Sequence, residues 1–136
     1  MIKKISILSA VVVTVFVILA FSLTNTSENK TTEKDDLIVK GDVIMPTKVS
    51  RPGCEVQDIC YIPSSIVTEK GKPVTWVNHD SAFHSVTSGF YEEPTDLFDS
   101  GHLDPFESYS VTFDESGTYD YFCTLHPWMK GQVIVK

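Results

Sequence analysis

A short stretch near the C-terminus carries three side chains that can bind a soft metal ion. Cys123, His126 and Met129 lie within seven residues and offer a thiolate, an imidazole and a thioether. Thiolate and thioether ligands select ions such as copper over calcium, magnesium or manganese. The stretch therefore predicts a metal-binding loop whose donor chemistry favours copper.

A second histidine must join this loop from elsewhere if the site is of the blue-copper type. A Cys with two His and a weak axial Met is the ligand set of blue-copper electron-transfer centres. The best candidate is His84, which opens a short predicted strand after a polar turn and could lie beside Cys123 across a sandwich. The other histidines, His79 and His102, stand in polar turns, and we expect a solvated surface role for both.

Two other interpretations of these residues remain open at this point. A single Cys or Met is often only part of a hydrophobic core. Zinc also binds Cys and His, although structural zinc sites commonly use paired Cys-x-x-Cys knuckles, and the sequence contains none. A dinuclear copper loop would need two cysteines, whereas this loop has one, so the pattern favours a mononuclear centre.

The spacing of these residues resembles that of the cupredoxins of the plastocyanin and amicyanin type, which are single-domain blue copper proteins. In that family one His ligand follows a Trp-x-Asn strand end, here 76–78, and a Cys-x-x-His-x-x-Met loop supplies the rest. The resemblance covers residues 37–136. It implies one copper ion, cycling between Cu(I) and Cu(II), bound by the following residues: His84, Cys123, His126 and Met129. It also implies that Asn78 ties the His84 turn to the Cys123 loop through Thr124; the alternative is a plain turn residue at the strand end.

The sequence from residue 37 onwards predicts an all-β domain. Short β-branched and aromatic runs alternate there with turn residues, which is typical of a β-sandwich, and the resemblance implies a Greek-key, cupredoxin-like one. The expected strands cover residues 37–45, 65–69, 73–78, 84–88, 108–113, 118–123 and 132–135. Residues 89–107 are expected to form a surface loop with one short strand near 97–100.

The first 36 residues differ in composition from the rest of the chain. Lys3 and Lys4 precede the uncharged apolar run 5–23, so residues 1–23 are expected to form a hydrophobic helix that serves as a signal peptide or a membrane anchor. A helix of this run is about 28 Å long, enough to span a hydrocarbon core of about 30 Å. Either alternative places the rest of the chain outside the cytoplasm. Residues 24–36 contain no aromatic residue, and we expect a flexible linker there.

Two further cysteines, Cys54 and Cys60, bracket a five-residue insert. In an exported protein, such a pair most often forms a disulfide. The odd count of three cysteines is then explained, because Cys123 stays free to bind the metal. The alternative is a second metal or redox site at this pair.

The distribution of charge bears on the partners. The net charge is -7, and residues 80–120 hold ten acidic residues and no Lys or Arg. Such a surface repels nucleic acid and attracts a basic redox protein. The alternative is that these acidic residues only keep the protein soluble. We therefore expect an exported monomer, membrane-attached if residues 1–23 are not cleaved, that carries single electrons between redox partners.

Other functional classes fit the site less well. We do not expect an enzyme, because four protein ligands leave no open position for a substrate. The alternative function is a copper carrier or sequestering protein without electron-transfer turnover.

Overall fold

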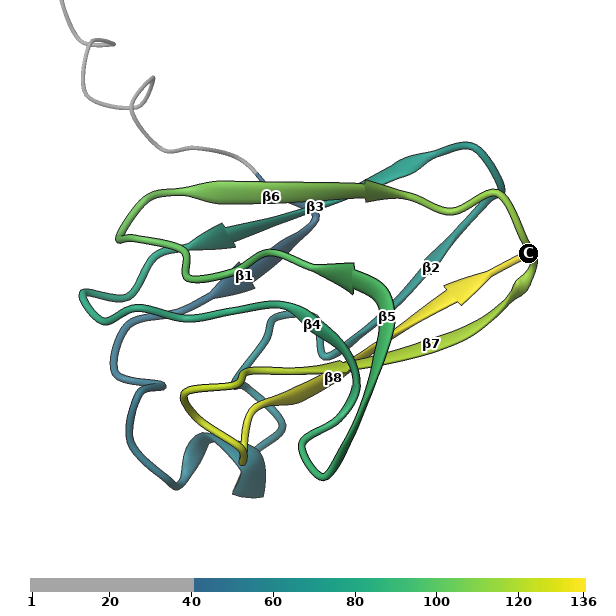
Figure 1. Cartoon of the computed structure of the whole chain (residues 1–136). Helices are drawn as coiled ribbons and strands as arrows, with labels where there is room; N and C mark the ends of the chain where they lie inside the picture. Colours follow the sequence, from purple (N-terminus) through teal and green to yellow (C-terminus); the bar gives the residue numbers. More distant parts are fainter. Residues whose placement is uncertain (1–40) are drawn as a thin grey trace, which may run out of the picture. The chain divides into compact units, whose positions relative to one another are not determined.

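The computed structural model describes residues 41–136, which form two facing β-sheets (Figure 1). The smaller sheet contains β1 (Val43–Met45), β3 (Pro73–Asn78) and β6 (Ser108–Thr112), in that order. The larger sheet contains, in spatial order, β2 (Ser65–Thr68), β8 (Lys130–Val135), β7 (Gly117–Phe122), β4 (Thr87–Phe90) and β5 (Glu93–Asp99). A 3-10 turn, η1 (Cys54–Val56), is the one helical element in this range. The predicted all-β sandwich is confirmed.

The core forms where side chains from the two sheets meet. Because side chains alternate between the two faces of a strand, Val74 and Trp76 of β3 both point inward and are buried. The Trp76 ring packs edge-on against Tyr121 of β7, with ring centroids 5.3 Å apart. Such aromatic pairs prefer edge-to-face packing, so this contact joins the two sheets at the centre of the sandwich.

Strand pairing in the larger sheet brings two loops together at one end of the sandwich. β7 and β8 are antiparallel, and Phe122 lies opposite Lys130, so residues 123–129 form the loop that connects them. β4 pairs with β7 on its other side, with Thr87 opposite Phe122. The chain just before β4, which includes His84, therefore lies beside the 123–129 loop.

The structure corrects the prediction for residues 84–107. The strand expected at 84–88 is β4 (Thr87–Phe90), and His84 makes only an isolated bridge to Leu103. The region expected to be mostly loop contains the seven-residue strand β5, which pairs with β4. β5 lies at the edge of the sheet and Phe98 is its one buried residue, so it lacks the alternating apolar pattern by which strands are predicted.

The β4–β5 pairing also depends on a glycine. Gly89 has a φ of 94°, and a Cβ atom there would lie 2.6 Å from the carbonyl oxygen of Glu93. The register shifts between Thr87 and Gly89, which marks an irregularity in the ladder. Glycine adopts such a conformation without steric cost, and here it allows β5 to approach closely.

The predicted targeting segment, residues 1–23, and the predicted linker, residues 24–36, lie outside the described residues. The same holds for the first part of the strand expected at 37–45. Between residues 41 and 136, the structure contains no helix with the length and apolar character needed to cross a membrane.

Candidate metal centre

Three of the predicted ligands meet at the end of the sandwich where the two loops adjoin. The Sγ atom of Cys123 lies 3.8 Å from Nδ1 of His84 and 3.6 Å from Nδ1 of His126, and the two nitrogens are 3.1 Å apart. A common point therefore lies about 2.0 Å from all three atoms, close to the metal–nitrogen and metal–sulfur bond lengths of about 2.0 to 2.3 Å known for zinc. The arrangement fits one metal ion held by a thiolate and two imidazoles.

Residues of the 123–129 loop are held by backbone hydrogen bonds among the ligand residues themselves. The amide of His126 donates to the carbonyl of Cys123, and the amide of Met129 donates to the carbonyl of His126. The amide of Cys123 in turn donates to the carbonyl of Met129, with a donor–acceptor distance of 3.1 Å. Met129, the fourth predicted donor, is fully buried at the end of this loop.

The Cys123 sulfur is placed for metal binding and not for a disulfide. It is fully buried, and it is the free cysteine of the chain because Cys54 and Cys60 form a disulfide, as predicted. The backbone N–H of Ser85 donates to Sγ at 3.3 Å. Hydrogen bonding around a cysteine sulfur stabilises the thiolate and tunes the redox potential of a copper site. The donor set and its surroundings therefore fit copper.

The second nitrogen of the His84 ring, Nε2, contacts a buried carboxylate. Nε2 of His84 lies 3.2 Å from Oδ2 of Asp80, and both side chains are buried. Burial acts to raise the pKa of Asp80, but hydrogen bonds from the backbone N–H groups of Lys48, Ser81 and Ser50 and the His84 contact lower it to about 2. An ionised carboxylate only accepts hydrogen bonds, so Nε2 carries the proton and Nδ1 turns its lone pair to the site.

Both histidines are favoured in the neutral form that a metal requires. Burial lowers the pKa of His84, and the nearby His126 lowers it further, against the opposing effect of Asp80. Burial also lowers the pKa of His126. Because metal and proton compete for the same lone pair, these shifts favour metal binding at neutral pH.

Asn78 shapes the turn that leads to His84. Its Nδ2 donates to the carbonyls of Ala82, at 2.8 Å, and Leu103, at 3.0 Å, and its Oδ1 accepts from the backbone N–H of Asp80. These bonds hold the 79–84 turn against the backbone at Leu103. They give Asn78 a role in positioning His84, by contacts other than the expected link to Thr124.

Ser85 provides the link between the two loops. Its Oγ accepts a hydrogen bond from the backbone N–H of Thr124 at 2.9 Å and lies 3.0 Å from the Thr124 hydroxyl. Its own backbone N–H reaches the Cys123 sulfur. Ser85 is thus the residue through which the His84 turn and the Cys123 loop are joined in the described structure.

Sequence reasoning did not single out Asp80 or Ser85 as site residues. Both lie close to His84 in the sequence, four residues before it and one after it, and a polar residue next to a proposed ligand would have been the signal. The remaining histidines lie outside the cluster: His102 is exposed and His79 is half-buried.

The comparisons with known proteins agree with this geometry. Residues 48–136 match the family described as copper binding proteins, plastocyanin/azurin family. The amicyanin of Paracoccus versutus is 36% identical over 83 residues, which cover 60% of this chain and 61% of that protein. The plastocyanin of Scenedesmus fuscus is 36% identical over 92 residues, covering 62% of this chain and 94% of that protein.

A solved structure shows the same fold. The novel purple cupredoxin from Nitrosopumilus maritimus superposes with a TM-score of 0.62 at 30% identity, covering 69% of this chain and 97% of that one. The chain thus spans less than two thirds of the Paracoccus versutus amicyanin but nearly all of the plastocyanin and the purple cupredoxin. Its candidate site for one copper ion consists of His84, Cys123, His126 and Met129. The chain belongs to the plastocyanin/azurin family of copper-binding proteins.

Proposed function

We propose that this protein is an exported electron carrier that binds one copper ion and passes single electrons between redox partners. The observation that carries the proposal is the convergence of one sulfur and two nitrogens on a point about 2.0 Å from each, within the range of metal–ligand bond lengths. Bound copper would supply a one-electron couple at that point. The other features of the site concern how the protein holds it and gives partners access to it.

The ligands are held so that their positions change little between oxidation states. The 123–129 loop is closed by its own backbone hydrogen bonds, and Ser85 fixes it to the His84 turn. His84, Cys123 and Met129 are fully buried, which keeps water out of the site. With four side chains supplied by the protein, no position is left open for a substrate, and this favours a carrier over an enzyme.

His126 is the ligand through which electrons would enter and leave. It is half-buried, whereas the other three ligands are fully buried. Leu125 beside it is 40% exposed, and the Trp128 ring lies 5.2 Å from the His126 ring. An apolar surface around an imidazole edge lets a partner approach closely without having to strip water from charged groups.

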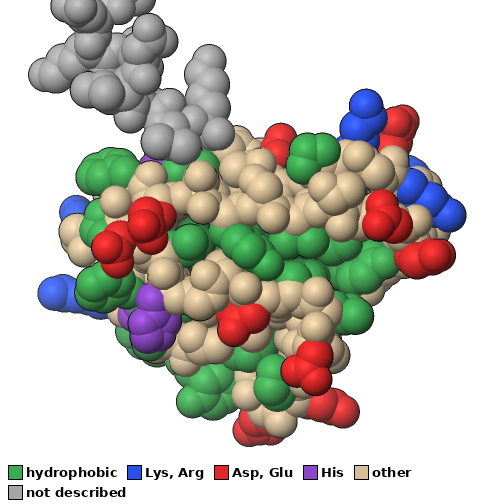
Figure 2. Space-filling model, turned by 45° about the horizontal axis from the view of Figure 1, so that its top comes forward, with side chains coloured by type: hydrophobic (Ala, Val, Ile, Leu, Met, Phe, Trp, Pro, Cys, Tyr) green, Lys and Arg blue, Asp and Glu red, His purple; other side chains and the backbone are tan. Residues whose placement is uncertain are grey.

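The partner is proposed to be a protein with a basic docking surface. Figure 2 shows Asp and Glu side chains spread over the face in view, with Lys and Arg toward its edges. A hollow of about 610 Å³ is lined by Asp96 and Asp99 and also by Phe122 and Thr124, which flank Cys123 in the sequence. A Lys or Arg side chain of the partner would be attracted to these carboxylates, close to the metal-binding loop.

Export is proposed from the sequence of residues 1–23 and from the disulfide. Disulfides persist in oxidising compartments outside the cytoplasm and are rare inside it, and Cys54 and Cys60 are joined. Whether the apolar run is retained as an anchor or removed is tested by the mass of the mature protein: an intact N-terminus supports the anchor, and a loss of about 23 residues supports a signal peptide.

The proposed function is tested by loading the protein with copper and recording its visible spectrum and voltammogram. An intense blue or purple band would show the Cys123 thiolate bound to Cu(II), and reversible one-electron cycling would support the carrier. Cys123→Ser should abolish the band while the far-ultraviolet β signal persists. A protein that retains copper but stays colourless in air, holding only Cu(I), would contradict electron transfer and favour the copper-sequestering alternative.

A further inference from the structure

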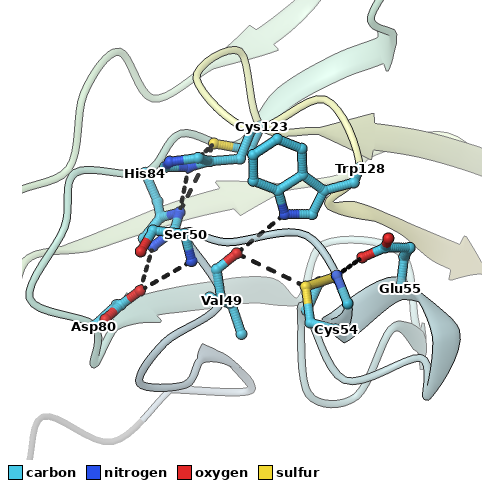
Figure 3. Close-up of a disulfide and its surroundings, with 11 residues drawn as sticks. Val49, Ser50, Cys54, Glu55, Asp80, His84, Cys123 and Trp128 are labelled. Carbon is cyan, nitrogen blue, oxygen red and sulfur yellow. Dashed lines mark hydrogen bonds and ion pairs between the residues drawn. A yellow bond between two sulfur atoms is a disulfide. The ribbon is translucent and has the colours of Figure 1, made fainter.

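Residues 46–62, which make up most of the connection between β1 and β2, contact the residues around the candidate copper site. We call this stretch the disulfide segment, because the Cys54–Cys60 bond closes a loop within it. Figure 3 shows Val49 and Ser50 between Cys54, on one side, and Asp80 and His84, on the other. We propose that the disulfide segment is a positioning element of the copper site: it fixes His84 and Ser85 and thereby sets the copper affinity.

The first connection runs to His84 through Asp80. The backbone N–H groups of Lys48 and Ser50 donate to the two carboxylate oxygens of Asp80, at 3.0 and 3.2 Å. Asp80 in turn contacts Nε2 of His84 at 3.2 Å. The disulfide segment thus supplies two of the donors that orient the carboxylate, and the carboxylate orients the imidazole.

The second connection runs to the cysteine through Tyr61, which directly follows Cys60. The Tyr61 hydroxyl donates to the carbonyl oxygen of Ser85 at 2.6 Å, and the side chain is fully buried. Ser85 donates its own N–H to the Cys123 sulfur. The Tyr61 ring also packs against Tyr121, with centroids 4.9 Å apart. A displacement of Tyr61 would therefore reach the residue that hydrogen-bonds the thiolate.

The third connection meets the 123–129 loop directly. The carbonyl oxygen of Val49 accepts a hydrogen bond from Nε1 of Trp128 at 3.1 Å, and the Cys54 sulfur lies 3.7 Å from the same oxygen. Trp128 precedes Met129 in the sequence. In Figure 3 dashed lines join the Val49 oxygen to both Cys54 and Trp128, so the disulfide lies next to the contact that holds the 123–129 loop.

The disulfide matters because the segment has little other means of holding its shape. Its regular structure is limited to η1 (Cys54–Val56) and a backbone bridge between Ile44 and Ile62. Residues 51–53 and 55–59 are exposed, so they contribute few buried contacts. A cross-link restricts the open conformations of such a loop. Removing the cross-link should increase the population of states in which the three connections are broken.

The test uses three variants of the full chain. Cys54→Ser combined with Cys60→Ser opens the loop, and Tyr61→Phe removes one hydroxyl while the loop stays closed. Val135→Ala is the matched control, because Val135 is buried at the C-terminal end of β8, whereas the ligand loop joins β8 at its other end, Lys130. The Cu(I) dissociation constant is measured by competition with a chromophoric chelator.

A second readout is taken on metal-free protein, where copper bonds cannot mask a loosened site. Nitrogen NMR of the His84 ring reports its tautomer and its motion. We expect the loop-opened variant to bind Cu(I) about tenfold more weakly, with Tyr61→Phe weakened less, since loss of such outer contacts costs about 10- to 100-fold in metal affinity. The loop-opened variant should also show a mixed or broadened His84 tautomer. Val135→Ala should lower the unfolding temperature without changing either readout.

Two results would overturn the proposal. One is a Cu(I) affinity within about twofold of wild type in both test variants with unchanged His84 signals; the other is an equal loss of affinity in Val135→Ala, which would point to general stability. If the loop-opened protein does not fold, Tyr61→Phe decides by the same criteria. Neither readout involves electron transfer, so a protein that binds copper but fails to cycle electrons would contradict the proposed function and leave this inference standing.

Discussion

Replacing Asp80 with Asn tests the view that a buried carboxylate sets the tautomer of His84. Oδ1 of Asp80 accepts from the backbone N–H groups of Lys48 and Ser81, and Oδ2 accepts from Ser50 and faces Nε2 of His84. All four partners are donors. An amide offers one oxygen and one NH2 group, so in Asp80→Asn the NH2 group must face two of these four donors.

The least costly response of the Asp80→Asn protein lies in the His84 ring itself. If the amide oxygen takes the place of Oδ1, the NH2 group faces Nε2, and His84 relieves the clash by moving its proton to Nδ1. That proton then occupies the lone pair that binds copper. The Ser50 N–H group still loses its acceptor, because no oxygen remains at the Oδ2 position.

The magnitude follows from these losses. A hydrogen bond to a charged group contributes about 1.5 to 3 kcal/mol, and a buried donor left without a partner costs about 1 to 3 kcal/mol. We therefore expect Asp80→Asn to lower the free energy of unfolding by about 2 to 4 kcal/mol and the copper affinity by about 10- to 100-fold.

The assay combines denaturant unfolding of the metal-free protein, chelator competition for Cu(I) and NMR assignment of the His84 tautomer. Asp114→Asn makes the same chemical change at an exposed turn between β6 and β7 and serves as the control. Asp80→Asn protein with wild-type copper affinity and the proton still on Nε2 of His84 would refute the reasoning.

Three other parts of the domain carry further predictions. Gly131→Ala would place a Cβ atom against the buried ring of its cross-strand neighbour Tyr121 and should lower the unfolding free energy by about 1 to 3 kcal/mol. Gly117→Ala, a position with room for a Cβ atom, should change the unfolding free energy little in the same denaturant measurement. Equal losses in the two variants would contradict the packing argument. Burial raises the pKa of Tyr121, so its neutral form is favoured in the folded state. The free energy of unfolding should therefore fall as pH rises above about 10, the ordinary tyrosine pKa, and Tyr121→Phe should show a smaller fall. Identical alkaline stability profiles of the two proteins would refute this role of Tyr121. Neutralising the hollow with Asp96→Asn and Asp99→Asn should slow electron transfer to a basic redox protein at low salt in stopped-flow measurements and flatten its salt dependence, and an unchanged salt dependence would show that these carboxylates carry only solubility charge.

The chemistry of the site could be predicted from the sequence because three of its donors are close together in the chain. Cys123, His126 and Met129 lie in one loop, and the pairing of the strands on either side restricts the positions that the side chains of a seven-residue loop can take. The strands at 73–78 and 118–123 were predictable for a similar local reason, since their β-branched and aromatic residues mark them. The choice of His84 as the fourth residue relied on its place at the start of a predicted strand after a polar turn, supported by the family resemblance, and the structure places it beside Cys123.

The edge of the larger sheet could not be predicted in the same way. Five of the seven residues in β5 precede its one buried residue and are exposed, and they include Glu93, Pro94 and Asp96. A strand of this kind is held by backbone pairing to β4 and by the close approach at Gly89. Neither leaves an apolar pattern in the sequence.

By itself, the sequence determined the three candidate ligands of the 123–129 loop and the all-β class, because both follow from residue types at short spacing. Only the tertiary structure decided how those ligands are supported. Lys48 is 32 residues from Asp80, and Tyr61 is 24 residues from Ser85. The groups involved are mainly backbone amides and carbonyls, which every residue carries. Their pairing depends on where the folded chain places them, so the contacts that orient His84 and the Cys123 sulfur become visible only in three dimensions.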